Sequence, residues 1–506
     1  MSSSSRNSSS SHLSRQGKPG RQTDSRKIAI VGGGISGLSA AYELARRGAE
    51  FILFEASGRL GGILETFRFG DFVIECGPDS WVSEKPWAHE LAVELGLEDQ
   101  ILGSNDQWRR TYLVREGKLQ PLPDGMRMMV PVKWAPILES PLFSWQARLG
   151  YLREPKRAEE LKAAAAGRND ESVAEFVRRH FGQEVSDTIA GPLLSGVFGG
   201  DVERLSVRAV MPAFVKMEAE HGSLITALQS RAEESAARKP IFSSLRTGLE
   251  TLVDRLAAHL PSHSVHLHEP ATAIRREEER WFLNTQKGEQ RFDSIVLATP
   301  PHVTQGLFLS LPGEGRRMAG LLPQRASSAI VVALAFDPAQ SSRMRIPRGF
   351  GFLTVSPLLN PAREKGPSGP GGKLQLLACT FVDQKFSHRA PSGGILLRAF
   401  FGGESAEAHL NEPDEALVSL AHRELTRIVG PLPASDITLV RRWPLSLPQY
   451  EVGHVERIAE LESLAASHPG LHLAGNAYHG VGLPDLIRDG RAAARAAIES
   501  CDARRL

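Results

Sequence analysis

A glycine string between a short apolar run and a helical pattern constrains this chain most. The string is Gly32-Gly33-Gly34-Ile35-Ser36-Gly37, with glycine at its first, third and sixth positions. Glycine at the first position permits a tight turn, at the third it lets the backbone approach a diphosphate, and at the sixth it lets helix and strand pack closely. Backbone N–H groups at the start of the helix can then bind the diphosphate oxygens.

The residues on either side of this string fit a strand–helix–strand unit. Residues 28–31 predict a buried parallel strand, residues 36–47 carry apolar side chains at helical spacing, and residues 51–54 predict a second strand. Glu55 follows directly, where a carboxylate can bind both hydroxyls of a ribose. The sequence therefore predicts a dinucleotide-binding α/β domain, and the alternative is a tight turn that binds nothing.

Length and composition exclude several other classes of protein. A chain of 506 residues predicts more than one domain, and its 60 basic and 58 acidic residues give no global charge that would favour nucleic acid. Three cysteines cannot form a disulfide framework and their spacing suits no zinc site, so we predict reduced thiols, a cytoplasmic protein and no metal. No apolar run is long enough to predict a membrane-spanning helix.

Residues 1–26 are rich in serine and arginine and contain one acidic residue. This composition cannot bury an apolar face, so we predict a disordered N-terminal tail. Organellar transit peptides have a similar composition, but no amphipathic helix is visible here, and the absence of an apolar core argues against a secretory signal.

A second glycine turn, Arg59-Leu60-Gly61-Gly62, follows Glu55, and residues 474–485 form a strand, a glycine-rich loop and a helix start. Both segments resemble the flavin amine oxidase and desaturase superfamily. There the second turn lies along FAD, and the C-terminal helix aims its N-terminus at the flavin pyrimidine. The resemblance implies FAD rather than NAD, and the loop 475–482 has no cysteine for a covalent link.

Three further segments narrow the resemblance: residues 77–80 (GPDS), residues 192–201 (PLLSGVFGGD), and residues 447–454 (LPQYEVGH), which follow Trp443. Together they resemble the oxygen-dependent protoporphyrinogen oxidases, most closely the soluble bacterial type, over residues 27–500. The resemblance implies that protoporphyrinogen IX loses six electrons in three steps to form the porphyrin for haem synthesis, with O2 reduced to hydrogen peroxide. Relatives with the same pattern oxidise coproporphyrinogen III, which is the alternative substrate.

The same resemblance implies two sets of binding residues. The FAD set comprises Gly32, Gly33, Gly34, Ile35, Ser36, Gly37, Glu55, Ala56, Arg59, Ile63, Gly77, Pro78, Asp79, Ser80, Ala271, Trp443, Val481, Gly482 and Leu483. The substrate set comprises Lys85 for a propionate, Val197 and Gly200 beneath the flavin, and Phe352 against the macrocycle. Lys85 could equally be a surface lysine and Phe352 a core residue. No side chain is assigned as catalytic, because flavin N5 is the expected acceptor.

The resemblance also implies an α/β fold with three parts, whose ranges follow. The FAD-binding domain takes residues 27–84, 242–300 and 437–506, the mixed-sheet substrate domain takes residues 85–105 and 301–436, and a helical insert takes residues 106–241. Strand-like runs lie at residues 264–268, 281–285, 294–298, 329–336, 374–381 and 471–474, a Gly/Pro-rich loop at 365–373, and a last helix at 485–499.

The stretch from Trp134 to Trp145, followed by Arg148, Arg153 and Lys156, could contact the inner face of a membrane or form a lid over the substrate pocket. The sequence also allows a homodimer. Competing functions are a flavin amine oxidase or carotenoid desaturase, a catalytically silent flavoprotein that carries porphyrin, and a structural membrane adaptor.

Overall fold

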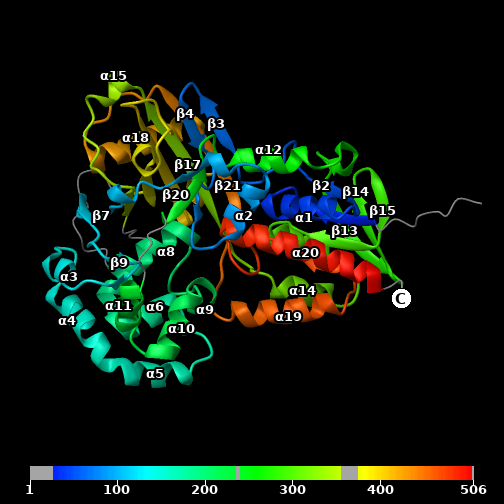
Figure 1. Cartoon of the computed structure of the whole chain (residues 1–506), viewed down its shortest axis with the longest axis horizontal. Coiled ribbons are helices and arrows are strands. Elements are labelled where there is room, and N and C mark those ends of the chain that lie inside the picture. Colours follow the sequence, from blue (N-terminus) through cyan, green and yellow to red (C-terminus); the bar gives the residue numbers. More distant parts are fainter. Residues whose placement is uncertain (1–26, 235–239, 355–373, 504–506) are drawn as a thin grey trace, which may run out of the picture.

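The computed structural model describes residues 27–234, 240–354 and 374–503. The predicted disordered tail and the Gly/Pro-rich loop 365–373 lie outside these ranges. Figure 1 shows three bodies: the glycine-motif domain at the right, a second sheet at the upper left, and a group of helices at the lower left.

A five-stranded parallel sheet forms the centre of the glycine-motif domain, in the order β12-β2-β1-β16-β22. Its strands are β1 (Lys27–Val31), β2 (Glu50–Phe54), β12 (Val265–His266), β16 (Ser294–Leu297) and β22 (Leu471–Leu473). β1 and β16 are almost continuously apolar and buried, as expected of parallel strands covered on both faces. The sheet thus joins segments from the start, middle and end of the chain, and it confirms the predicted α/β domain.

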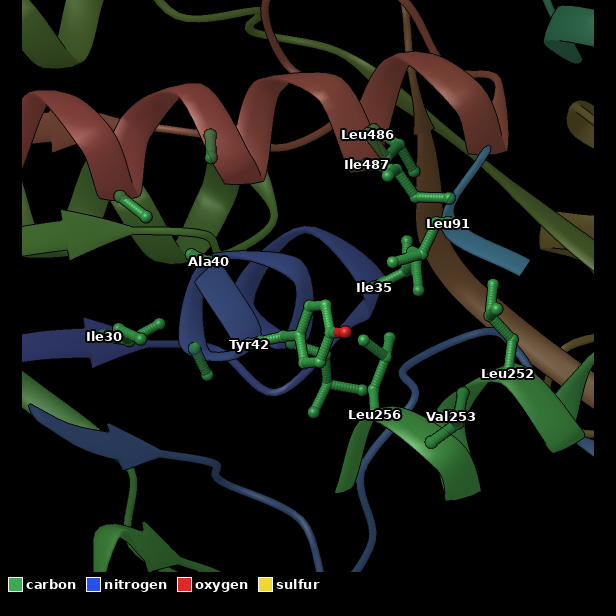
Figure 2. Packing of buried hydrophobic residues seen from close by; sticks show 14 of the residues in the cluster. Ile30, Ile35, Ala40, Tyr42, Leu91, Leu252, Val253, Leu256, Leu486 and Ile487 are labelled. Atoms are coloured by element: carbon green, nitrogen blue, oxygen red, sulfur yellow. The ribbon is translucent and has the colours of Figure 1, made fainter. Parts of the chain in front are cut away.

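Helices cover one face of this sheet, namely α1 (Ile35–Arg46), α2 (Trp87–Glu94), α12 (Glu250–Ala258) and α20 (Leu483–Ala503). Figure 2 shows Ile35 and Tyr42 of α1 packed among Leu91, Leu256 and Ile487 from the other three helices. The opposite face is covered by an antiparallel sheet and by further helices: β13 (Ala271–Glu277), β14 (Arg280–Thr285), β15 (Gly288–Phe292), α13 (Pro301–Leu309), α14 (Gly315–Leu321) and α19 (His454–Ala466).

The second body is a seven-stranded mixed sheet in the order β21-β17-β20-β19-β18-β7-β8. Its strands are β7 (Thr111–Arg115), β8 (Lys118–Pro121), β17 (Ala326–Phe336), β18 (Gly351–Thr354), β19 (Ala378–Phe381), β20 (Ile395–Gly402) and β21 (Ile437–Pro448). One face packs on α18 (Asp414–Val429). The other face meets α8 (Gly191–Phe198) and the hairpin of β3 (Thr66–Phe69) and β4 (Phe72–Glu75).

The helical body is built mainly from α3 (Ala135–Glu139), α4 (Trp145–Arg153), α5 (Ala158–Ala166), α6 (Val173–Phe181), α8, α9 (Val207–Val210), α10 (Pro212–His221) and α11 (Leu224–Glu234). Apart from α5, these helices share a core of buried apolar side chains with the segment before α3. Among the residues that the structure describes, no helix is both long enough and apolar enough to cross a membrane.

The predicted strand positions and the last helix are confirmed, but three boundaries differ from the sequence-based division. β7 and β8, predicted within the helical insert, extend the seven-stranded sheet because β7 pairs with β18. β21, predicted in the FAD-binding domain, pairs along most of β17. α2, predicted in the substrate domain, packs its apolar face on α1 and α20 instead.

Glu43 of α1 is a buried carboxylate that ties this helix to α20. Its side chain is 2% exposed and accepts hydrogen bonds from Arg47 Nε (2.8 Å) and Arg491 Nε (2.9 Å), with Arg495 Nη1 at 3.4 Å. Burial opposes ionisation, but the neighbouring guanidinium groups lower the pKa of Glu43 below its ordinary value. α1 and α20 are therefore held together by charge as well as by apolar contact.

We expect Glu43→Ala to lower the free energy of unfolding by about 2 kcal/mol, because it removes the buried carboxylate that three guanidinium groups share, although Arg491 keeps its contact with Glu94. Urea denaturation at neutral pH would measure this loss. Glu499→Ala, at an exposed position of the same helix α20, is the matched control. The difference between the two variants should shrink as the pH falls from the ordinary glutamate pKa, about 4.3, toward the lowered pKa of Glu43, because protonation removes the charge that binds the arginines. Equal losses in both at neutral pH would contradict this role.

Candidate flavin and substrate site

The first glycine turn lies between β1 and α1, as predicted. Gly32 has a φ of +105°, and a Cβ there would lie 2.5 Å from the carbonyl oxygen of Ala298. A Cβ on Gly37 would lie 1.9 Å from the carbonyl oxygen of Gly32. Both positions therefore require glycine for the turn itself, whatever the turn binds.

Gly34 differs from these two glycines because a Cβ there would meet no described atom within 4 Å. It is the N-cap residue of α1, and no side chain caps the helix and no acidic residue lies in its first turn. The helix therefore points backbone N–H groups and its positive dipole end into open space. This arrangement fits a dinucleotide diphosphate, with Ile35, Ser36 and Gly37 supplying the first N–H groups.

The second glycine turn packs directly on the first. Gly61 N donates to Gly33 O at 2.8 Å, and Gly34 pairs with Gly61 in a parallel bridge. Arg59 Nη1 donates to the carbonyl oxygens of Leu60 and Leu64, both at 3.1 Å, which fixes the turn.

Glu55 lies at the mouth of both turns and its carboxylate faces the first. Oε2 accepts from Gly33 N at 2.7 Å and Oε1 accepts from Ser57 N at 2.8 Å. The backbone of Glu269 donates to Glu55 O at 2.9 Å, which brings the segment before Ala271 next to Glu55 and the exposed Ala56. These positions form one end of an extended site, as expected for the adenosine half of the cofactor.

The loop after β4 provides the next part of this site. A Cβ on Gly77 would lie 2.0 Å from the carbonyl oxygen of Ile63, so the two predicted positions are in backbone contact. Trp443 Nε1 donates to Cys76 O at 2.7 Å and places the indole beside this loop. Ile63, Gly77 and Trp443 come from three separate segments of the chain, and the fold brings them together.

Two buried cations, Lys385 and Arg398, contact the segment from Gly77 to Ser80 through Asp79. Lys385 Nζ lies 2.9 Å from Asp79 Oδ1 and Arg398 Nη1 lies 3.4 Å from Asp79 Oδ2. Burial alone would raise the pKa of Asp79, but these two cations hold it well below its usual range. Asp79 is therefore an ionised carboxylate in the protein interior.

The glycine-rich loop between β22 and α20 contains Val481 and Gly482 and ends at Leu483. Tyr450, which is 1% exposed, bridges this loop: its hydroxyl donates to Asn476 O at 2.6 Å and accepts from Gly480 N at 3.2 Å. The Tyr450 ring stacks on His454 at 3.9 Å, and burial lowers the pKa of His454 to about 4. Tyr450 therefore holds the loop through its hydroxyl, and its ring is supported by the neutral side chain of His454.

Lys85 lies in the turn between β5 (Trp81–Val82) and α2, and its side chain is 45% exposed. Its ammonium group is 2.5 Å from Oδ2 of Asp485, a buried carboxylate in the first turn of α20. Lys85 is therefore not an isolated surface lysine, because its ammonium group joins the turn before α2 to the first turn of α20.

Phe352, predicted to lie against the macrocycle, is instead a core residue of the seven-stranded sheet. Alternation along β18 directs Phe352 to the face that packs on α18, where it is 1% exposed and contacts Phe381. Leu353 points to the opposite face, where its side chain lies 3.0 Å from a Cβ built on Gly196 of α8. The core interpretation of Phe352 therefore holds, and Leu353 takes the position facing the helical body.

Val197 and Gly200 lie at the end of α8, beside the seven-stranded sheet. Val197 is 55% exposed, whereas a Cβ on Gly200 would lie 1.9 Å from Gln449 Oε1. A cavity of about 270 Å³ is lined by Gly200, Ser327, Leu377 and Gln449 among other residues, but by none of the glycine-turn residues. The cavity therefore lies between the end of α8 and the seven-stranded sheet, and it is separate from the glycine turns.

Sequence reasoning missed four residues of this site: Lys385, Arg398, Tyr450 and Leu353. Arg398 had a usable signal, since it is the one charged residue in the apolar run from Ile395 to Phe401. A buried charge needs a partner, which would have pointed to Asp79. Tyr450 lies in the segment 447–454 that carries the family resemblance but was assigned no role, whereas Lys385 and Leu353 gave no comparable signal.

We expect Gly34→Val to abolish FAD retention while leaving the fold intact, because the added side chain fills the space before α1 without meeting protein atoms. The flavin absorbance per polypeptide chain and the circular dichroism of the purified variant would test this. Gly306→Ala, at a helical glycine that also meets nothing within 4 Å, is the control. A normal flavin content in Gly34→Val would exclude the proposed diphosphate position.

We expect Tyr450→Phe to weaken FAD binding about fivefold, because it removes the hydroxyl that bridges the loop and costs about 1 kcal/mol. Titration of the apoprotein with FAD would give the Kd. Tyr112→Phe removes a comparable hydrogen bond, to Arg348 O at 2.9 Å, away from the loop and should leave this Kd unchanged. Equal Kd values for both variants would contradict a specific role for Tyr450.

Comparison with known proteins identifies the family. Residues 35–498 match the flavin-containing amine oxidoreductase family. A coproporphyrinogen III oxidase from Bacillus subtilis strain 168 is 31% identical, covering 93% of this chain and 98% of the relative. The chloroplastic protoporphyrinogen oxidase 1 from Arabidopsis thaliana is 29% identical, covering 92% of this chain and 86% of the relative.

Solved structures agree with this assignment. One from Exiguobacterium sp. 255-15, provisionally assigned as a protoporphyrinogen oxidase, has a TM-score of 0.77 at 30% identity and covers 94% of this chain and 99% of its own. Cyclohexylamine oxidase from Brevibacterium oxydans IH-35A shares the fold alone, with a TM-score of 0.63 at 16% identity. The predictions of FAD, fold class and an oxidoreductase are confirmed. The chain belongs to the flavin-containing amine oxidoreductases and, within them, to the porphyrinogen oxidases.

Proposed function

We propose that this enzyme oxidises a porphyrinogen to the corresponding porphyrin for haem synthesis, with O2 as the final acceptor. The macrocycle loses six electrons and six protons in three steps, and each step reduces one O2 to one H2O2. FAD held at the two glycine turns would supply the two-electron redox chemistry of each step. The similarity to a coproporphyrinogen III oxidase over nearly the full length of both chains carries this proposal.

The substrate is either coproporphyrinogen III or protoporphyrinogen IX. Three relatives, at 31%, 28% and 30% identity, are named coproporphyrinogen III oxidases. These names favour coproporphyrinogen III as the substrate. Protoporphyrinogen IX, the first expectation from the sequence, stays the second candidate because the Arabidopsis thaliana relative at 29% identity is named for it.

The chain's own contribution to this reaction would be to bind and orient the macrocycle and to exclude water. The open face of the seven-stranded sheet offers Leu353 and Leu377 as apolar surface, and α8 lies opposite. Lys85 is our candidate for binding a propionate at the rim, since an ammonium suits a carboxylate and Asp485 holds it in place. No side chain is proposed as a general base.

We also propose peripheral contact with a membrane through the helical body. Leu138, Trp145 and Leu152 are 42%, 66% and 40% exposed, and Arg148 and Arg153 lie on the same helix as the last two. Exposed aromatic and apolar side chains next to basic ones suit a lipid interface. The lid function remains the alternative, and the cytoplasmic location and the homodimer remain predictions.

Porphyrin fluorescence growth in air, run on both porphyrinogens, would test the function. We expect Lys85→Ala to raise KM severalfold with a smaller change in kcat, because it removes a contact made by both ground state and transition state. Lys216→Ala, at a lysine 71% exposed on α10, is the control and should leave both constants unchanged.

The Kd for FAD should be measured on the same samples, because loss of Lys85 also leaves Asp485 unpaired. A raised KM at an unchanged Kd supports a direct contact with substrate. An unchanged KM would exclude it. No fluorescence above autoxidation with either porphyrinogen, in protein that retains FAD, would contradict porphyrinogen oxidation altogether.

A further inference from the structure

Five charged side chains are buried together behind the loop from Gly77 to Ser80. We call them the Asp79 cluster, and its members are Glu75, Asp79, Lys385, Arg389 and Arg398. Each side chain is at most 13% exposed, and both guanidinium groups are at most 1% exposed. The cluster contains three cations and two carboxylates, so its members carry an excess of positive charge.

Lys385 is fully engaged by the loop. Its ammonium group lies 2.9 Å from Asp79 Oδ1, 3.1 Å from Asp79 Oδ2 and 3.2 Å from Ser80 Oγ. Three acceptors match the three N–H groups of a lysine. Lys385 therefore has no N–H left for a substrate carboxylate, and any influence it has on the site is through its charge and its hold on the loop.

The two arginines fix the same loop from the other side. Arg398 lies on β20, on the face of the sheet opposite α18, and its Nη2 donates to Gly77 O. Arg389 Nη2 donates to Ser244 Oγ at 2.6 Å, and that hydroxyl donates to Asp79 O at 2.7 Å. Arg389 Nη1 also lies 3.1 Å from Glu75 Oε1. The loop and the charges therefore form one rigid unit.

An excess cation in the protein interior is costly unless an anion offsets it, and its field is little screened there. Reduced isoalloxazine carries a negative charge near neutral pH, whereas the oxidised ring is neutral. We infer that the Asp79 cluster raises the reduction potential of FAD by favouring the negatively charged reduced ring. This inference rests on the proposed position of Gly77 to Ser80 along the flavin, and it does not depend on which porphyrinogen is the substrate.

The test is the midpoint potential of the bound flavin, measured on the holoenzyme by equilibration with reference dyes. Lys385→Met removes a positive charge and should lower the potential. Asp79→Asn removes a negative charge and should raise it. Lys162→Met is the control, since Lys162 lies on α5 and donates to Glu220 O at 3.0 Å, and it should leave the potential unchanged.

Opposite shifts in the two variants separate an electrostatic role from a structural one, because damage to the loop would move both potentials in the same direction. Shifts of the same sign, or no shift in Lys385→Met, would overturn the inference. If Lys385→Met does not retain FAD, Lys385→Gln can replace it, because the amide keeps a donor toward Asp79. We expect Lys385→Gln to lower the midpoint potential as well. If neither lysine variant retains FAD, the test depends on Asp79→Asn. A midpoint potential that does not rise in Asp79→Asn would then overturn the inference.

The midpoint potentials can be measured without any porphyrinogen. If the enzyme failed to oxidise either porphyrinogen, the potentials would still report on the cluster. A potential shift without activity would therefore contradict the proposed function alone, and activity without a shift would contradict this inference alone.

Discussion

Close backbone contact at the start of α1 is the constraint on which the rest of the structure depends. The sixth glycine of the motif lies against the carbonyl of the first, and a Cβ on Gly490 of α20 would lie 2.1 Å from Ser36 O. Three backbone segments therefore meet at the first turn of α1 with no room for side chains. This contact packs α20 directly on the first turn of α1, and in the proposed site the N-terminus of α1 would face the diphosphate and that of α20 the flavin.

The remaining parts of the proposed site come from segments far apart in sequence, and hydrogen bonds join these segments in pairs. Glu55 is linked to Glu269, Cys76 to Trp443, and Gly77 to Arg398. A site assembled in this way has little structure before the whole domain folds, because each link joins segments at least 200 residues apart in the chain.

The sequence was sufficient for the glycine-motif domain because both turns, the acidic residue and the C-terminal loop depend on local backbone requirements. It was insufficient for the substrate side. Phe352 and Leu353 are adjacent apolar residues, and only the pairing of β18 with β7 and β19 decides which of them faces the site. Lys385 lies in a segment without periodicity, and the segment 447–454 carries the family resemblance without showing that its Tyr450 contacts the loop 475–482.

β21 belongs to the substrate sheet, yet it carries Trp443 beside one flavin segment and leads directly into Tyr450, which holds another. The sheet that would receive the macrocycle is therefore mechanically continuous with two supports of the chromophore. Any molecule that displaces this strand moves both supports at once. If FAD binds along these segments as proposed, its absorption spectrum would respond to a ligand that shifts β21 without contacting the flavin ring.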